Sequence, residues 1–288
     1  MKGLCRLYDI ETELRESHII PKFAIEHMKR TGSRFLRSFS NPNKRMQDGM
    51  KEYLLSAKAE QDFSKREKWF AEKIFYPYLK EDQKQLSYDN NLFYFSISLL
   101  WRVLIGQLNH PSLQGEPYLD RLKEVSEDWK LYLRGEGKIP KYNKVYIYLT
   151  GRVLDHDIES DEVDYYLTRT LDATIVANNP PTFVSVYAKF NRFIFWATVY
   201  GGNTKGLSTL KINPTGGVIN FPQNCKDEYM NSFFRNRIIQ MGTLPRVSEK
   251  QKKIIEDDFE RNKSTFLKSD AADSMRNDLI LEKRRKNI

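Results

Sequence analysis

The sequence predicts an α+β fold, with a small N-terminal module over residues 1–86 and a larger domain of buried helices and an antiparallel sheet over residues 87–288. Two observations predict this class. Apolar residues recur mostly with the helical period of about 3.6 between residues 59 and 134, and with the strand period of about 2 after residue 143. The 288 residues are 40% hydrophobic, which is enough to bury a core.

In the N-terminal module, short extended segments precede one helix. SRFLRSFS and KEYLLS are predicted to be strands or extended pieces, and residues 59–79 are predicted to be a helix that ends at Pro77. One face of this helix presents an apolar stripe that should be buried, made by Phe63, the stem of Arg66, Phe70, Ile74 and Tyr78. The polar segment 80–92 is predicted to be a linker.

In the larger domain, residues 92–108 are predicted to be a deeply buried helix, and residues 118–134 an amphipathic helix that stops before Gly135. Three segments rich in Val, Ile, Tyr and Phe are predicted to form one antiparallel sheet: 144–154, 182–200 and 217–221. Ser248 is a predicted N-cap for a helix over residues 248–266. The basic tail 283–287 is expected to be frayed.

Composition excludes several classes of protein. The longest apolar run, residues 93–106, contains Arg102 and is too short to span a bilayer, so no membrane partner is expected. The N-terminus has no apolar segment typical of a secretory signal, which favours a cytoplasmic protein. The two cysteines, Cys5 and Cys225, cannot form a four-cysteine zinc site, so any metal site must use His and carboxylates.

The charge balance favours a polyanionic partner, because 47 Lys and Arg against 38 Asp and Glu give a net charge of +9. Residues 27–47, here called the basic stretch, contain no acidic residue, and Phe35 and Phe39 lie among the cations. Such a segment could run along a phosphate backbone. A solvated loop that is basic by chance is the alternative. The predicted nucleic-acid-binding residues are Lys29, Arg30, Arg34, Arg37, Lys44 and Arg45.

Three motifs lie in the first 80 residues: CRLY at 5–8, SHIIPKF at 17–23 and QDGMKEYLLSAKAEQDFSKREKWFA at 47–71. They resemble the HNH, or ββα-metal, nucleases, and within them a group of bacterial proteins with the pattern CxLC, SHIIPxF and QxGxxEyLLCxxCExxFSxxEkxFA. The resemblance implies an HNH-like ββα module and a metal-dependent endonuclease. It also implies DNA as the favoured substrate and a role in bacterial defence against phage.

The resemblance assigns roles to individual residues. In the family a His at the end of the first strand is the general base, and the helix supplies ligands to one divalent cation. Carried over, His18 is the predicted catalytic base that activates water, and Glu60 and Glu67 are the predicted ligands of Mg²⁺ or Mn²⁺. These two glutamates are seven residues apart and share one face of the predicted helix. Glu16 and Glu52 are candidate additional oxygen ligands.

The sequence also departs from the family. There, two CxxC pairs hold a structural zinc, whereas here Cys5 is joined by Tyr8, Ser56 and Ala59 at the other three positions. No structural zinc is therefore expected. Packing should replace it, with Tyr8, Leu54, Leu55 and Phe63 as the candidate residues.

Other interpretations stay open. The loss of three zinc cysteines favours a non-catalytic nucleic-acid-binding or scaffold subunit that kept the ββα shape and has a protein partner or self-associates. The size of the second domain is compatible with a small-molecule enzyme or sensor. A lone His is more often structural than catalytic, and Glu residues on a lysine-rich helix are more often surface ion-pair partners. The acidic segment 154–164 around His156 lacks the ligand spacing of an EF-hand and is predicted to be a solvated turn.

Overall fold

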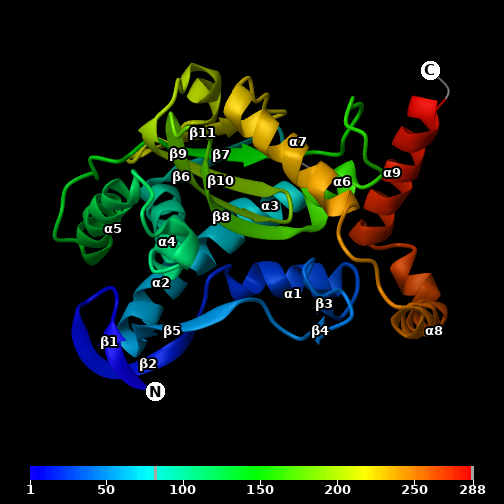
Figure 1. Cartoon of the computed structure of the whole chain (residues 1–288), viewed down its shortest axis with the longest axis horizontal. Helices are drawn as coiled ribbons and strands as arrows, with labels where there is room; N and C mark the ends of the chain where they lie inside the picture. Colours follow the sequence, from blue (N-terminus) through cyan, green and yellow to red (C-terminus); the bar gives the residue numbers. More distant parts are fainter. Residues whose placement is uncertain (81–82, 287–288) are drawn as a thin grey trace.

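The computed structural model describes residues 1–80 and 83–286, and its fold is α+β (Figure 1). A four-stranded antiparallel sheet has the order β7-β10-β9-β8. Its strands are β7 (Val145–Leu149), β8 (Leu171–Ala177), β9 (Phe183–Phe190) and β10 (Phe193–Gly201). Every residue of β9 is buried, because helices cover both faces of this sheet.

The two faces of the sheet pack against different helices. On one face, α4 (Asn90–Gln107) and α2 (Ala57–Phe70) contribute aromatic side chains, and Phe70 stacks on Phe95 with ring centroids 4.1 Å apart. On the other face, α6 (Val163–Arg169) and α7 (Glu228–Gly242) complete a second apolar cluster around Tyr187 and Trp196. The sheet therefore lies between two helical layers.

The N-terminal strands form a separate three-stranded antiparallel sheet in the order β1-β2-β5. Its strands are β1 (Lys2–Cys5), β2 (Ile10–His18) and β5 (Lys51–Ser56). Helix α2 follows β5 directly, since Ser56 is its N-cap and accepts a hydrogen bond from the Ala59 N–H. The chain thus runs strand, strand, helix through β2, β5 and α2.

A long connection separates β2 from β5. It contains helix α1 (Lys22–Arg30) and a short hairpin of β3 (Leu36–Arg37) and β4 (Arg45–Met46). The basic stretch therefore occupies the second half of α1 and this hairpin.

One apolar cluster extends from Cys5 through α2 and α4 to Ile219, so the N-terminal module and the larger sheet share a core. The predicted boundary between residues 86 and 87 falls inside β6 (Gln85–Asp89), which pairs with β11 (Gly216–Asn220) in a two-stranded sheet. The prediction that residues 217–221 join the larger sheet is therefore wrong. The predicted linker is also wrong from residue 85 on, where β6 and α4 form, and residues 81–82 lie outside the described residues.

Several predicted elements are confirmed. Helix α4 is buried nearly all round, and α5 (Leu119–Arg134) ends at Gly135, whose φ of 76° is the left-handed conformation that glycine adopts easily. Helix α8 (Glu249–Phe266) begins after Ser248, which accepts a hydrogen bond from the Gln251 N–H. The predicted apolar stripe is buried at Phe63 and Phe70 of α2, and further along the chain at Ile74 and Tyr78.

Other predictions need correction. The helix predicted to end at Pro77 continues through a π-helical turn (Ala71–Phe75) into α3 (Tyr76–Leu79). Pro77 lies in the first turn of α3, directly after the π-helical turn. Helix α9 (Asp270–Lys286) includes most of the tail that was expected to be frayed, and Asn287 lies outside the described residues.

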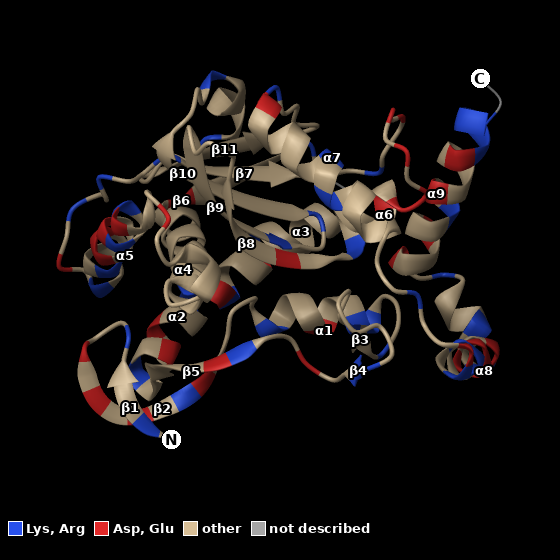
Figure 2. Ribbon diagram, in the orientation of Figure 1, with Lys and Arg blue, Asp and Glu red and all other residues tan. Residues whose placement is uncertain are grey.

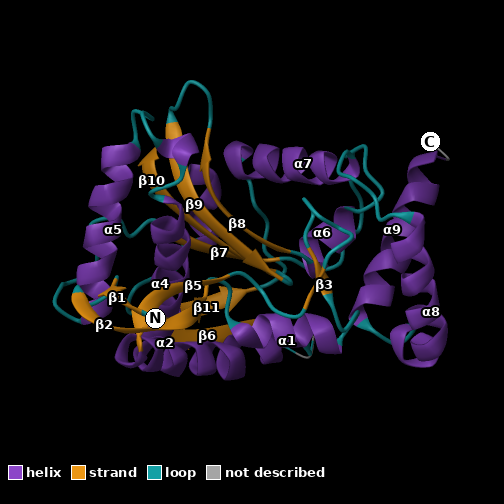
Figure 3. Ribbon diagram, turned by 60° about the horizontal axis from the view of Figure 1, so that its bottom comes forward, coloured by secondary structure: helices purple, strands orange, loops and turns teal. Residues whose placement is uncertain are grey.

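The remaining short elements are 3-10 turns at Pro111–Leu113 and Lys205–Leu210. Helices α8 and α9 lie at one end of the molecule, away from α4 and α5 (Figure 3). Among the described residues, no helix combines the length and the apolar character needed to cross a bilayer.

Candidate functional site

His18 is the last residue of β2, and its imidazole pairs with Asp48. The Nε2 atom lies 2.9 Å from Asp48 Oδ1, and the side chain of His18 is 17% exposed. Asp48 lies three residues before Lys51, the first residue of β5, and Lys51 is opposite His18 in the strand register. The same carboxylate accepts a hydrogen bond from the Gly49 N–H. Its Oδ2 also forms an ion pair with Lys51 Nζ, 2.7 Å away. The imidazole is therefore held at the open end of the β2–β5 pair.

The charge of Asp48 determines which nitrogen of the His18 ring has the proton in this pair. Burial on its own would raise the pKa of Asp48, but the hydrogen bonds from Lys51, His18 and the Gly49 N–H outweigh it and lower that pKa well below its usual value. Asp48 is thus a carboxylate, which can only accept hydrogen bonds, so Nε2 of His18 has the proton. In the neutral imidazole, Nδ1 is then the nitrogen that can take up a proton.

A buried arginine, Arg102, links Glu67 to the backbone of His18. Arg102, on α4, donates one hydrogen bond to Glu67 Oε1 and another to the main-chain oxygen of His18, both at 2.7 Å. Its side chain is 3% exposed, so its charge needs a partner, and Glu67 provides it. The contact joins the end of β2 to α2, and it uses the Glu67 carboxylate as a counter-ion.

The other predicted ligands lie apart from this contact. Glu60 is in the first turn of α2, and its buried Oε1 has no hydrogen-bond partner among the described residues. Glu16 pairs with Lys51, and burial raises the pKa of Glu52. Within residues 1–80 and 83–286, no three His, Cys, Asp or Glu side chains gather as metal ligands. His18, Glu60 and Glu67 as placed here do not form one ligand set, and the divalent cation stays a prediction.

The positions that correspond to the zinc cysteines of the family that the sequence resembles are adjacent in space. They are Cys5, Tyr8, Ser56 and Ala59. The buried Sγ of Cys5 accepts a hydrogen bond from the Ser56 N–H at 3.2 Å. The hydroxyl oxygen of Ser56 in turn accepts one from the Ala59 N–H. Tyr8 donates its hydroxyl to Asp62 at 2.7 Å. Of the residues predicted to replace the metal by packing, Leu54, Leu55 and Phe63 are buried and Tyr8 packs against the core.

The β3–β4 part of the basic stretch lies beside α8, and both are labelled in Figure 2. Asp258 of α8 lies 3.4 Å from Arg34 and 2.9 Å from Arg45. Gln251 of the same helix accepts a hydrogen bond from Arg37 at 3.3 Å. The segment has no acidic residue of its own, and its acidic partner lies more than 200 residues away in the sequence.

The remaining members of the basic stretch have other environments. Lys29 donates to the main-chain oxygen of Gln47 at 2.9 Å, Arg30 lies over the ring of Tyr76, and Lys44 is exposed. The ring of Phe35 lies against both Arg34 and Arg45, with centroid distances of 5.1 and 4.7 Å. These cation–π contacts join residues of the basic stretch to one another.

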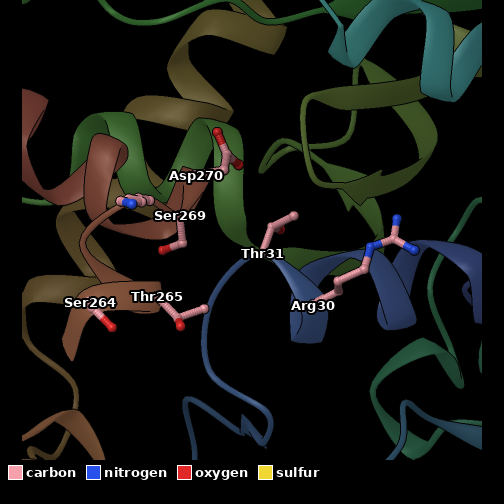
Figure 4. Close-up of a pocket in the computed structure, with 7 residues that line it drawn as sticks. Arg30, Thr31, Ser264, Thr265, Ser269 and Asp270 are labelled. Carbon is pink, nitrogen blue, oxygen red and sulfur yellow. The ribbon is translucent and has the colours of Figure 1, made fainter. Parts of the chain in front are cut away.

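A pocket of about 390 Å³ adjoins the basic stretch. Figure 4 shows Arg30 and Thr31 of the α1 end on one side, Ser264 and Thr265 of α8 on another, and Ser269 and Asp270 at the start of α9. Asp270 is also the shared partner of three arginines from separate elements: Arg152, Arg169 and Arg192. Together these ion pairs fix the first turn of α9 to the body of the molecule.

Sequence reasoning missed Asp48, Arg102 and Asp258. Arg102 left a signal, because an arginine inside an apolar helix must be buried with a partner. Asp48 lies within the quoted QDG segment but at a variable position of the motif, and Asp258 is one of several acids on a charged helix. Comparison of the chain with protein-family models, curated proteins and solved structures found no match.

Proposed function

We propose that this chain acts on nucleic acid as an HNH-like phosphodiester hydrolase in which His18 is the general base. The observation that supports this most is the His18–Asp48 pair at the end of β2, 2.9 Å apart. A carboxylate bonded to one ring nitrogen keeps the other nitrogen free for proton transfer, which is the arrangement that general-base catalysis requires.

In the proposed reaction, Nδ1 of His18 takes a proton from a water molecule. The water oxygen forms a bond to phosphorus, the bond from phosphorus to the leaving sugar oxygen breaks, and that oxygen takes up a proton from solvent. Asp48 stabilises the imidazolium that forms, because its carboxylate accepts the Nε2–H. The predicted Mg²⁺ or Mn²⁺ would neutralise charge on the phosphate when bound, but the described carboxylates do not form its ligand set.

Two further observations support the proposal. The strand–strand–helix order of β2, β5 and α2 agrees with the ββα arrangement of the resembling family, and the four former zinc positions adjoin one another. The basic stretch, inserted between β2 and β5, provides cations for phosphate contacts. DNA as substrate and a defence role against phage rest on the resemblance alone.

The test is cleavage of plasmid DNA, single-stranded DNA and RNA by the purified chain with Mg²⁺ or Mn²⁺. His18→Ala should lower the rate by about 10²- to 10⁴-fold while nucleic-acid binding is kept. Asp48→Asn should also lower it, since the ring loses its fixed tautomer, and Asp48→Glu should recover part of the rate. His110→Ala, at an exposed His bonded to Ser112, is the matched control and should cleave normally. Full activity in His18→Ala would contradict the proposal.

A second candidate function is a non-catalytic nucleic-acid-binding subunit. The Glu67–Arg102 pair favours it, because a predicted metal ligand serves there as a counter-ion. Nucleic-acid binding that depends on the basic stretch, without cleavage under any metal condition, would identify this function.

A further inference from the structure

We infer that α8 is a displaceable cover on the basic stretch, and that Asp258 occupies the guanidinium groups that a nucleic-acid phosphate would take. This inference concerns regulation of the proposed nucleic-acid surface and rests on that proposed function. The partner is the phosphate backbone, and the competitor belongs to the same chain.

The contacts of Asp258 resemble those of a phosphate. Its Oδ1 lies 3.4 Å from Arg34 and its Oδ2 lies 2.9 Å from Arg45, so one arginine just before β3 and one arginine of β4 converge on one anion. Carboxylates and phosphates accept hydrogen bonds from guanidinium groups in similar geometry. Seven residues earlier on α8, Gln251 bonds Arg37, which lies opposite Arg45 in the β3–β4 pair. Three of the six predicted phosphate-binding cations therefore have α8 as their partner.

Helix α8 is held mainly by these polar contacts. Of its 18 residues none is buried, although α7 and α9 on either side of it in the sequence both bury residues. Its N-terminal end is bonded through the Ser248 N–H to Asn43 Oδ1 at 2.7 Å. Below its C-terminal end lies the pocket of about 390 Å³, so Ser264 and Thr265 face a space and not a packed surface (Figure 4). Displacement of α8 would therefore expose no core.

Because phosphate and Asp258 need the same arginines, binding of nucleic acid through the hairpin requires α8 to move or Asp258 to rotate away. The cover lowers the affinity of any polyanion for the hairpin. A ligand that contacts a single arginine would then bind too weakly to displace α8. A continuous nucleic-acid strand, which contacts several cations at once, would be favoured over such a ligand.

The test compares two variants that change the charge of α8 equally. Asp258→Asn removes the competing carboxylate. Asp257→Asn removes its neighbour, an exposed carboxylate that makes no ion pair or hydrogen bond with any described residue. Affinities are measured by fluorescence anisotropy with a short labelled DNA duplex and with the corresponding single strand. Asp258→Asn should bind about five- to tenfold more tightly than the wild-type chain, as expected from loss of two partly exposed ion pairs. Asp257→Asn should bind within about twofold of wild type, because an exposed charge is largely screened.

A second measurement follows the helix itself. Hydrogen exchange of the α8 amides should be faster in Asp258→Asn than in Asp257→Asn, while that of α4 stays unchanged. Equal affinities of the two variants, in a chain whose binding is weakened by Arg34→Ala and Arg45→Ala, would overturn the cover and leave the proposed function standing. Absence of binding in wild type and in both variants would overturn both inferences. Tight binding by Asp258→Asn alone would support both.

Discussion

At the scale of single residues, buried and half-buried polar groups have partners that come from distant parts of the sequence. His18 meets Asp48, Arg102 meets Glu67, and Arg45 meets Asp258. Each of these contacts joins two elements, so its loss affects both the local charge and the position of an element.

His27 makes the stability of the fold depend on pH. Burial, together with the nearby Arg169 and Arg30, lowers its pKa to about 4. In the unfolded chain a histidine has a pKa of about 6.5, so between these two values the unfolded state binds a proton that the folded state does not. The contribution of His27 to stability should therefore fall by about 2 to 3 kcal/mol as the pH is lowered from about 6.5 to 4. Asp278, whose pKa burial raises to about 6, contributes in the opposite direction over the same range.

Urea unfolding of wild type and His27→Gln across this pH range measures the effect. The variant should lose the His27 contribution, because glutamine does not titrate, so its stability relative to wild type should rise as the pH is lowered from about 6.5 to 4. His110→Gln, at an exposed histidine, should keep the wild-type slope. An unchanged slope in His27→Gln would assign the pH dependence to other groups.

At the scale of elements, the Arg102–Glu67 pair connects α4, α2 and the end of β2. Removal of one partner leaves a buried charge uncompensated, whereas removal of both does not. We expect Glu67→Ala to lower the free energy of unfolding by about 3 kcal/mol, and the double variant Glu67→Ala with Arg102→Met to recover a large part of that loss.

Urea titrations of the single and double variants measure this coupling. Glu72→Ala is the control. Among the described residues, the exposed Glu72 carboxylate makes only a distant ion pair with Lys68 at 3.9 Å, so the change should alter stability by less than about 0.5 kcal/mol. A loss in Glu67→Ala that Mg²⁺ or Mn²⁺ restores would instead favour the predicted metal role of Glu67.

At the scale of the whole molecule, the N-terminal module and the larger sheet share one apolar cluster. Phe70 of α2 stacks on Phe95 of α4 and contacts Phe193 and Phe195 of β10. A fragment of residues 1–86 would expose this aromatic surface to water and lose its burial, which is the main source of stability. We expect the fragment to be unfolded or to aggregate, as judged by circular dichroism and gel filtration. A cooperative thermal transition in the isolated fragment would show that the module is an independent domain.

The sequence was sufficient for elements whose pattern is local. The apolar run of α4, the cap of α8 by Ser248 and the stripe around Phe63 and Phe70 depend on neighbours within a few turns, and these predictions are confirmed. The pairing of β6 with β11 depends on two segments about 130 residues apart, and neither segment specifies the other.

The same limit applied to the candidate site. The motif resemblance pointed to His18, but the carboxylate that contacts its ring comes from the far end of the β2–β5 connection. The counter-charge of the basic stretch comes from α8, and no local count of acidic residues could include it.

The anchoring of α8 at both ends has a kinetic consequence. One end follows α7, and the other joins α9, whose first residue Asp270 is fixed by three arginines. Asp258 is thus an intramolecular ligand of the hairpin, and its effective concentration is set by these short tethers, on the order of millimolar, and not by the amount of protein. Dilution therefore cannot remove it. If the hairpin binds nucleic acid as proposed, a strand that dissociates would be replaced by Asp258 of the same molecule without a second encounter in solution. Each molecule therefore restores its own contact between Asp258 and the hairpin, without a second molecule.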